Sequence, residues 1–246
     1  MEFWLRTSGT WINVLTVTLG TVLGLSTGRY LPARVQRSIA QGIGLLTLWI
    51  GFSMAGSLAQ AGTDRVEGVI LGLIAIVVGG AIGELIGIEE RLIRFGDRLR
   101  RWVNGSGAFT EGFVTASLLF CVGPMTLIGC LNNGLSGDNT LIVLKASMDG
   151  ITAIALSSIY GVGVGASILT IAVYQGSISL LAGQLAGIIP DPASDPRILL
   201  LTGVGGLMVL GTGINLLELG KVRVASFLPS LAIAPLLQQW ATFLNL

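Results

Sequence analysis

Residues 118–150, LLFCVGPMTLIGCLNNGLSGDNTLIVLKASMDG, decide how the rest of the chain is interpreted. The stretch is strongly apolar, yet it contains Pro124 within an apolar run and two ionisable residues, Lys145 and Asp149, one helical turn apart. In a lipid bilayer, a helix-breaking proline and charged side chains cost free energy and are tolerated only inside protein or beside a water-filled cavity. These residues are therefore the first candidates for a functional site.

The composition is that of a membrane protein. Hydrophobic residues make up 52% of the 246 residues and charged residues only 11%, with a mean hydropathy of +0.82. Soluble globular domains have roughly 25% charged residues. We therefore expect an all-α polytopic membrane protein, with residues 1–246 forming a single integral membrane domain in the lipid bilayer. The net charge of +1 gives no indication of nucleic-acid binding.

Apolar runs of ~20 residues, the length that crosses a bilayer, predict about eight transmembrane helices. They cover residues 9–27, 39–59, 68–88, 112–131, 140–160, 166–188, 198–217 and 224–243. Residues 89–103 place arginines between apolar residues at helical spacing, which predicts a basic amphipathic helix at the membrane surface. For this segment, an ordinary positively charged helical loop and a specific lipid site are both open.

Lysine and arginine residues are distributed unevenly between the two sides of this eight-span topology. One side has Arg6, Arg65 and Arg197, whereas the other has a much larger basic set: Arg29, Arg34, Arg37, Arg91, Arg94, Arg98, Arg100, Arg101, Lys221 and Arg223. Since cytoplasmic loops carry the excess of basic residues, we expect both termini to lie outside the cytoplasm.

Two spans carry glycines at four-residue spacing, a pattern that lets another helix approach closely. These glycines are Gly20, Gly24 and Gly28 in the first span and Gly79, Gly83 and Gly87 in the third. They predict glycine-rich helix packing, either within the chain or in a homo-oligomer. Residues 41–48 (QGIGLLTL) are also similar to residues 202–209 (TGVGGLMV), which suggests an inverted repeat of spans 1–3 and 6–8, an arrangement found in many secondary transporters.

Polar residues of spans four, five and six reach a similar depth in the bilayer. At ~1.5 Å per residue, Asp149 lies roughly 14 Å into a hydrocarbon core about 30 Å thick. Pro124, Tyr174 and Gln175 come to about the same level. Pro124 also leaves a backbone carbonyl near Phe120 without its helical partner, through either a broken helix or a simple kink.

The two charged residues allow more than one interpretation. Lys145 either pairs with Asp149 or extends its long side chain outward to the membrane surface. Asp149 is too short to reach the surface from an intact span, so it is half of a structural ion pair, a carboxylate whose charge changes with a proton or cation, or a residue that a broken helix exposes at the surface.

Other chemistries have little support. The chain contains no histidine, and Cys121 and Cys130 are nine residues apart inside apolar sequence, so we expect no metal site and no cofactor. No serine or cysteine lies in a recognisable nucleophile motif. We therefore expect no catalytic residues and no enzyme activity.

Several motifs together resemble a known family. They are CVGPM at residues 121–125, GLSGD at 134–138, KASMDG at 145–150, YQG at 174–176, GELIGIEE at 83–90, INLL at 214–217 and RVASFLP at 223–229. In order and spacing they resemble the bacterial inner-membrane family catalogued as domain of unknown function 554. The resemblance implies no defined activity, although members are often described as candidate transporters, and it adds Asp138 to the candidate residues.

The leading hypothesis is a secondary transporter or channel-like protein for a small solute or ion, with a midplane site between spans four, five and six. Asp149 is its charge-changing or cation-coordinating group, Lys145 a modulator or anion contact, and Pro124 the helix breaker, while Tyr174 and Gln175 line the site. The alternative is a non-transporting scaffold that assembles through its glycine faces.

Overall fold

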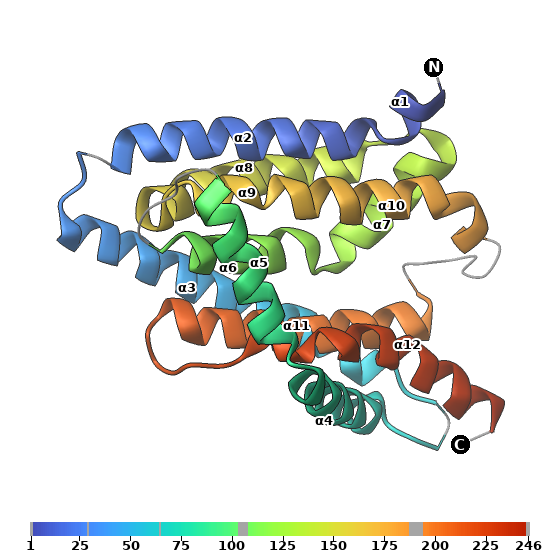
Figure 1. Ribbon diagram of the computed structural model, residues 1–246. Coiled ribbons are helices and arrows are strands. Elements are labelled where there is room, and N and C mark those ends of the chain that lie inside the picture. Colours follow the sequence, from blue (N-terminus) through green and yellow to red (C-terminus); the bar gives the residue numbers. More distant parts are fainter. Residues whose placement is uncertain (1, 29, 64, 103–107, 187–193, 245–246) are drawn as a thin grey trace. The chain divides into compact units, whose positions relative to one another are not determined.

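The protein is described by a computed structural model, which covers residues 2–28, 30–63, 65–102, 108–186 and 194–244 (Figure 1). All regular secondary structure in these residues is helical. The elements are α1 (Glu2–Arg6), α2 (Ser8–Gly28), α3 (Ala33–Ala55), η1 (Gly56–Gln60), α4 (Gly68–Ile86), α5 (Ile88–Trp102), α6 (Phe109–Cys121), α7 (Pro124–Ser136), α8 (Thr140–Tyr160), α9 (Gly163–Ala166), α10 (Ile168–Ala186), α11 (Pro196–Leu216), η2 (Val224–Phe227) and α12 (Leu228–Phe243).

The all-α membrane class is confirmed. Six helices in the described residues are long and apolar enough to cross a membrane, or seven if the bent pair of α6 and α7 is one span. These segments correspond to the first seven predicted spans. The eighth, residues 224–243, is divided into η2 and α12, and α12 has only 16 residues, fewer than the ~20 of a full span. Residues 187 and 188 of the sixth predicted span, and Val103 of the predicted surface helix, lie outside the described residues.

The chain forms two compact units. The first comprises Met1–Ile43 and Ile93–Pro190, and the second comprises Gly44–Leu92 and Asp191–Leu246. The single domain and the inverted repeat stay predictions.

In the first unit, α2 and α8 lie side by side along their lengths (Figure 1). Gly20 faces Gly150, Gly24 faces Ile154 and Gly28 faces Ser158, so the two helices run in the same direction. A Cβ atom on any of these three α2 glycines would collide with the α8 backbone. The first predicted glycine face is therefore used for packing within the chain. The helix α10 packs mainly on α7 and also contacts α2 and α6.

In the second unit, α4 packs on η2 and α12. Gly79 lies against Ser230, and Gly83 lies against the backbone of Ser226. The third predicted glycine, Gly87, has a different role, because its left-handed conformation (φ 69°) ends α4. The core of this unit is formed by buried side chains of η1, α4, α11 and α12: Leu58, Leu71, Ala75, Leu200, Val204, Ala234 and Ala241.

The predicted surface helix corresponds to α5. Its first turn contains Glu89 and Glu90 and its last turn contains Arg100 and Arg101, an order of charges that complements the helix dipole. Trp102 is 81% exposed. The helix that the arginine spacing predicts is therefore confirmed as α5, and its place at the membrane surface stays a prediction.

Candidate functional site

The site is organised by a break between α6 and α7. The helix α6 ends at Cys121, α7 begins at Pro124, and the two helices are bent by 61°. Between them, Gly123 adopts φ 156° and ψ 153°, a region of backbone conformation that is essentially restricted to glycine. Proline suits the first turn of α7 because it lacks an N–H group that would have no partner there. Of the two interpretations of Pro124, the structure has the broken helix.

The break leaves the backbone carbonyl of Phe120 without a helical donor, and a side chain takes that place. The Lys145 Nζ donates to the Phe120 carbonyl oxygen at 2.6 Å. The Thr126 hydroxyl makes a longer contact with the same oxygen, at 3.4 Å. Since a positive charge is favourable at the carboxyl end of a helix, the ammonium group also complements the dipole of α6.

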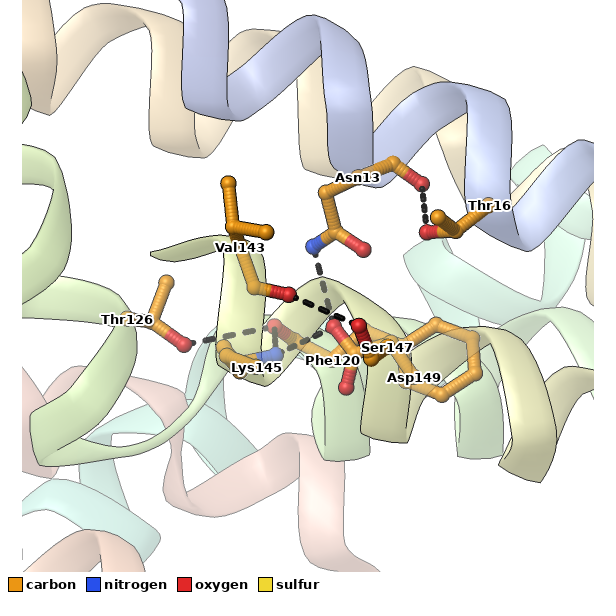
Figure 2. Close-up of polar contacts among 8 residues, drawn as sticks. All are labelled: Asn13, Thr16, Phe120, Thr126, Val143, Lys145, Ser147 and Asp149. Atoms are coloured by element: carbon orange, nitrogen blue, oxygen red, sulfur yellow. Dashed lines mark hydrogen bonds and ion pairs between the residues drawn. The ribbon is translucent and has the colours of Figure 1, made fainter. Parts of the chain in front are cut away.

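Lys145 and Asp149 form a buried ion pair on α8 through Nζ and Oδ2 (Figure 2). The two residues are only 7% and 6% exposed. The ammonium group lies between the Phe120 carbonyl and the Asp149 carboxylate, so the outward extension of Lys145 considered for the sequence is not adopted. The same Asp149 oxygen accepts a hydrogen bond from Asn13 Nδ2 of α2 at 2.9 Å.

The pair is electrically neutral as a whole but expensive to bury. Removing two charges from water costs several kcal/mol per ion, and their mutual attraction offsets this only when further hydrogen bonds are made. The Phe120 carbonyl and the Asn13 amide provide those hydrogen bonds. The presence of a buried ion pair therefore does little to support a purely stabilising role for these two residues.

Gln175 is fully buried on α10, as its predicted depth requires. Neither its amide oxygen nor its amide nitrogen hydrogen-bonds another described residue. The next residue on α10, Gly176, faces the side chain of Thr10 on α2, and the Thr10 hydroxyl also lacks a hydrogen-bond partner within the described chain. Among the described residues, Gln175 therefore has no hydrogen-bond donor or acceptor paired with it, and no hydrogen bond joins it to the ion pair. Tyr174, beside it, is half-buried.

Asp138 lies apart from this group. It is exposed in the turn between α7 and α8, where its carboxylate accepts a hydrogen bond from the Thr140 backbone N–H at 2.9 Å. The hydrogen bonds from Thr140 lower the pKa of Asp138. The structure gives Asp138 a local role at the start of α8 and does not bring it to the ion pair.

Asn133 is a buried polar residue that the sequence interpretation missed. Its Nδ2 donates to the Leu5 carbonyl at 3.1 Å and to Ser8 Oγ at 3.0 Å, while its Oδ1 accepts from Gly9 N at 3.0 Å. These bonds hold the junction of α1 and α2 against α7. The predicted fourth span ended at residue 131 and left Asn133 in a loop, whereas α7 continues to Ser136.

The comparison with known proteins gives the family. The profile of the family described as "Protein of unknown function (DUF554)" matches residues 8–239. The chain belongs to this family. The DUF554 match includes the helix break, the ion pair and Gln175, and it confirms the resemblance that the motifs indicated.

Two curated relatives extend this result. An uncharacterized membrane protein, YdfK of Bacillus subtilis, is 30% identical over 227 residues, covering 92% of this chain and 93% of YdfK. The uncharacterized protein YqgA of Escherichia coli is 26% identical over 243 residues, covering 96% of this chain and 98% of YqgA. No solved structure matches the chain. Membership of DUF554 therefore supports a membrane protein and assigns no activity.

A second polar cluster, in the other unit, links η2 to the junction of α4 and α5. Arg223 pairs with Glu84 and Glu90, and Glu84 also accepts a hydrogen bond from Ser226 at 3.0 Å. Glu89 accepts one from Ala225 N at 3.0 Å, and burial raises the pKa of its carboxyl group. The ion pairs of Arg223 are largely exposed. We therefore interpret the cluster as a structural contact that holds residues 223–226 against the α4–α5 junction in this DUF554 protein.

Proposed function

We propose that this chain is a transport protein of the bacterial inner membrane, either a secondary transporter or a channel-like protein, for a small solute or ion. The observation that carries the proposal is the buried Lys145–Asp149 pair, whose ammonium group binds the Phe120 carbonyl that the helix break leaves without a backbone donor. Ionisable residues within membrane spans typically mark ion or substrate pathways. Broken helices, with their unpaired backbone groups, form the binding sites of many secondary transporters.

In this proposal Asp149 is the group whose partner changes during transport, exchanging Lys145 for a proton or a cation. Gln175 and Thr10 supply polar groups that have no hydrogen-bond partner within the described part of the chain, as a site for a solute requires. The proposal includes no catalysis and no cofactor.

The first test measures ligand binding and flux. A screen of ions and small solutes by thermal stabilisation of the purified protein identifies a ligand, whose uptake is then measured in reconstituted vesicles. We expect the neutral double variant Lys145→Met/Asp149→Asn to fold and to lose at least about tenfold in flux, equivalent to about 1.4 kcal/mol.

The matched control is Lys221→Met/Glu111→Gln, which removes the same two charges at exposed positions. This control should transport like the wild type. Wild-type flux through the Lys145→Met/Asp149→Asn variant, or no stabilisation of the wild type by any ion, pH or solute, would reject the proposed site.

The proposed orientation places both termini outside the inner membrane. The support is the excess of lysine and arginine in the loops assigned to the cytoplasm. A reporter enzyme that is active only in the periplasm, fused after residue 246, should be active, and the same reporter placed in the 218–223 loop should be inactive. An active cytoplasmic reporter at the C-terminus would show that the orientation or the number of spans is wrong.

The alternative function is a scaffold that assembles with a second copy or a partner through its glycine faces. This role has less support, because Gly20, Gly24 and Gly28 contact α8 of the same chain, and Gly79 and Gly83 contact Ser230 and Ser226. A scaffold would lose assembly on Gly20→Leu or Gly83→Leu and would be indifferent to Asp149→Asn.

A further inference from the structure

The Lys145 ammonium group lies between an oxygen atom of α6 and one of α8, and side chains of α7 and α2 hydrogen-bond to the same two groups (Figure 2). It contacts the Phe120 carbonyl oxygen at 2.6 Å and the Asp149 carboxylate. The Thr126 hydroxyl contacts the same carbonyl, and Asn13 donates to the same carboxylate while its own Oδ1 has no hydrogen-bond partner among the described residues. Thr126 and Asn13 are fully buried.

Carboxylate, backbone carbonyl and hydroxyl oxygens are the kinds of ligand that hard metal cations prefer. Carbonyls at the ends of broken membrane helices also coordinate Na⁺ in transporters. In this chain a carboxylate and a backbone carbonyl bind a cation that is covalently attached to the protein, the ammonium group of Lys145, and the Thr126 hydroxyl lies 3.4 Å from that carbonyl oxygen.

We infer that these oxygen atoms form a binding site for an alkali-metal cation. In this structure the ammonium group of Lys145 fills the site, so the ammonium group and an alkali-metal cation compete for it. The inference rests on the proposed function for its place in transport, because exchange of Lys145 for a mobile cation would be the step that changes the partner of Asp149. Binding itself can be measured without transport.

The charge of the site selects a monovalent cation. When the Lys145 ammonium leaves, the carboxylate of Asp149 contributes one negative charge to a buried environment. A monovalent cation restores the neutrality that the ammonium provides, whereas a divalent cation leaves one uncompensated positive charge, which is costly in a low-dielectric interior. We therefore expect Li⁺, Na⁺ or K⁺ to bind in preference to Mg²⁺ or Ca²⁺.

The test uses Lys145→Ala, which removes the competing ammonium and leaves the oxygen atoms in place. Thermal unfolding of the purified full-length protein is compared in lithium, sodium, potassium and choline chloride at equal ionic strength. Choline is too large for the space of a lysine side chain. We expect at least one alkali chloride to raise the melting temperature of Lys145→Ala by roughly 5 °C or more relative to choline chloride.

Two controls separate this site from a general effect of salt. The wild type should respond much less than Lys145→Ala, because its own ammonium competes. The double variant Lys145→Ala/Asp149→Asn should not respond, because the carboxylate charge is gone. Equal melting temperatures of Lys145→Ala in all four salts, an equal response of the double variant, or stabilisation by Mg²⁺ or Ca²⁺ alone would overturn the inference.

Lys145→Ser serves as the second variant if Lys145→Ala does not fold, since its hydroxyl adds one more oxygen ligand. Folding of either variant only in an alkali chloride supports the site. Failure of both in every salt shows that Lys145 is a fixed structural partner and rejects it. Stabilisation of Lys145→Ala by an alkali chloride, without any measured flux, would support this inference and reject transport. Flux of another solute without that stabilisation would support transport and reject this inference.

Discussion

Lys145→Met should lower the free energy of unfolding by about 3–5 kcal/mol when measured in choline chloride. The substitution keeps most of the side-chain volume and removes the positive charge. Asp149 is then left as a buried carboxylate whose remaining described donor is the Asn13 amide. The loss should appear in urea or thermal unfolding of the detergent-solubilised protein.

The neutral double variant Lys145→Met/Asp149→Leu is the decisive comparison. Removing both charges removes the cost of burying them, which offsets the loss of their hydrogen bonds to the Phe120 carbonyl and the Asn13 amide, so the double variant should be well above Lys145→Met in stability. A double-mutant cycle then gives the interaction energy of the pair. If Lys145→Met alone were as stable as the wild type, the ammonium group could not lie between Phe120 and Asp149 as the structure has it.

Gly20→Ala is expected to have the second large effect. The added methyl group would meet the Gly150 carbonyl oxygen and lie 3.0 Å from the Cβ of Ala153, so α2 and α8 would have to separate. Overpacking of this kind typically costs 1–3 kcal/mol, and a collision with rigid backbone belongs to the upper part of that range, about 3 kcal/mol. The measurement is the unfolding free energy in the same detergent.

Gly42→Ala is the matched control. Gly42 is also within a helix, but nothing lies within 4 Å of a Cβ atom built there. Because alanine favours a helix over glycine by roughly 0.5–1 kcal/mol, this variant should be as stable as the wild type or slightly more so. A similar loss in both variants would mean that α2 and α8 are not in close contact at Gly20.

Much of the fold follows from local sequence. Apolar length predicted the spans that contain α2, α4, α8 and α11, because the bilayer thickness sets how many residues a span needs. The helical period placed Lys145 and Asp149 on one face, and the missing N–H of Pro124 identified the Phe120 carbonyl as unpaired.

Contacts between residues far apart in the chain do not follow from local sequence. Asn13 bonds to Asp149 across 136 residues, and Lys145 reaches a carbonyl 25 residues away. A lysine near the start of a span is able to turn outward or inward, and only the position of the Phe120 carbonyl selects the inward direction. Likewise, four-residue spacing of glycines predicts a close neighbour but does not say that the neighbour of α2 is α8.

The contact between α2 and α8 has a mechanical consequence. With glycines of α2 pressed on the α8 backbone over several turns, these helices cannot slide or tilt against each other without steric collision, so they move as one rigid rod. Asn13 of α2 and Asp149 of α8 therefore keep a fixed separation. The helix break at residues 122–123 separates α6 from α7, and a swing of α6 about this break would draw the Phe120 carbonyl away from Lys145 while leaving Asp149 in place.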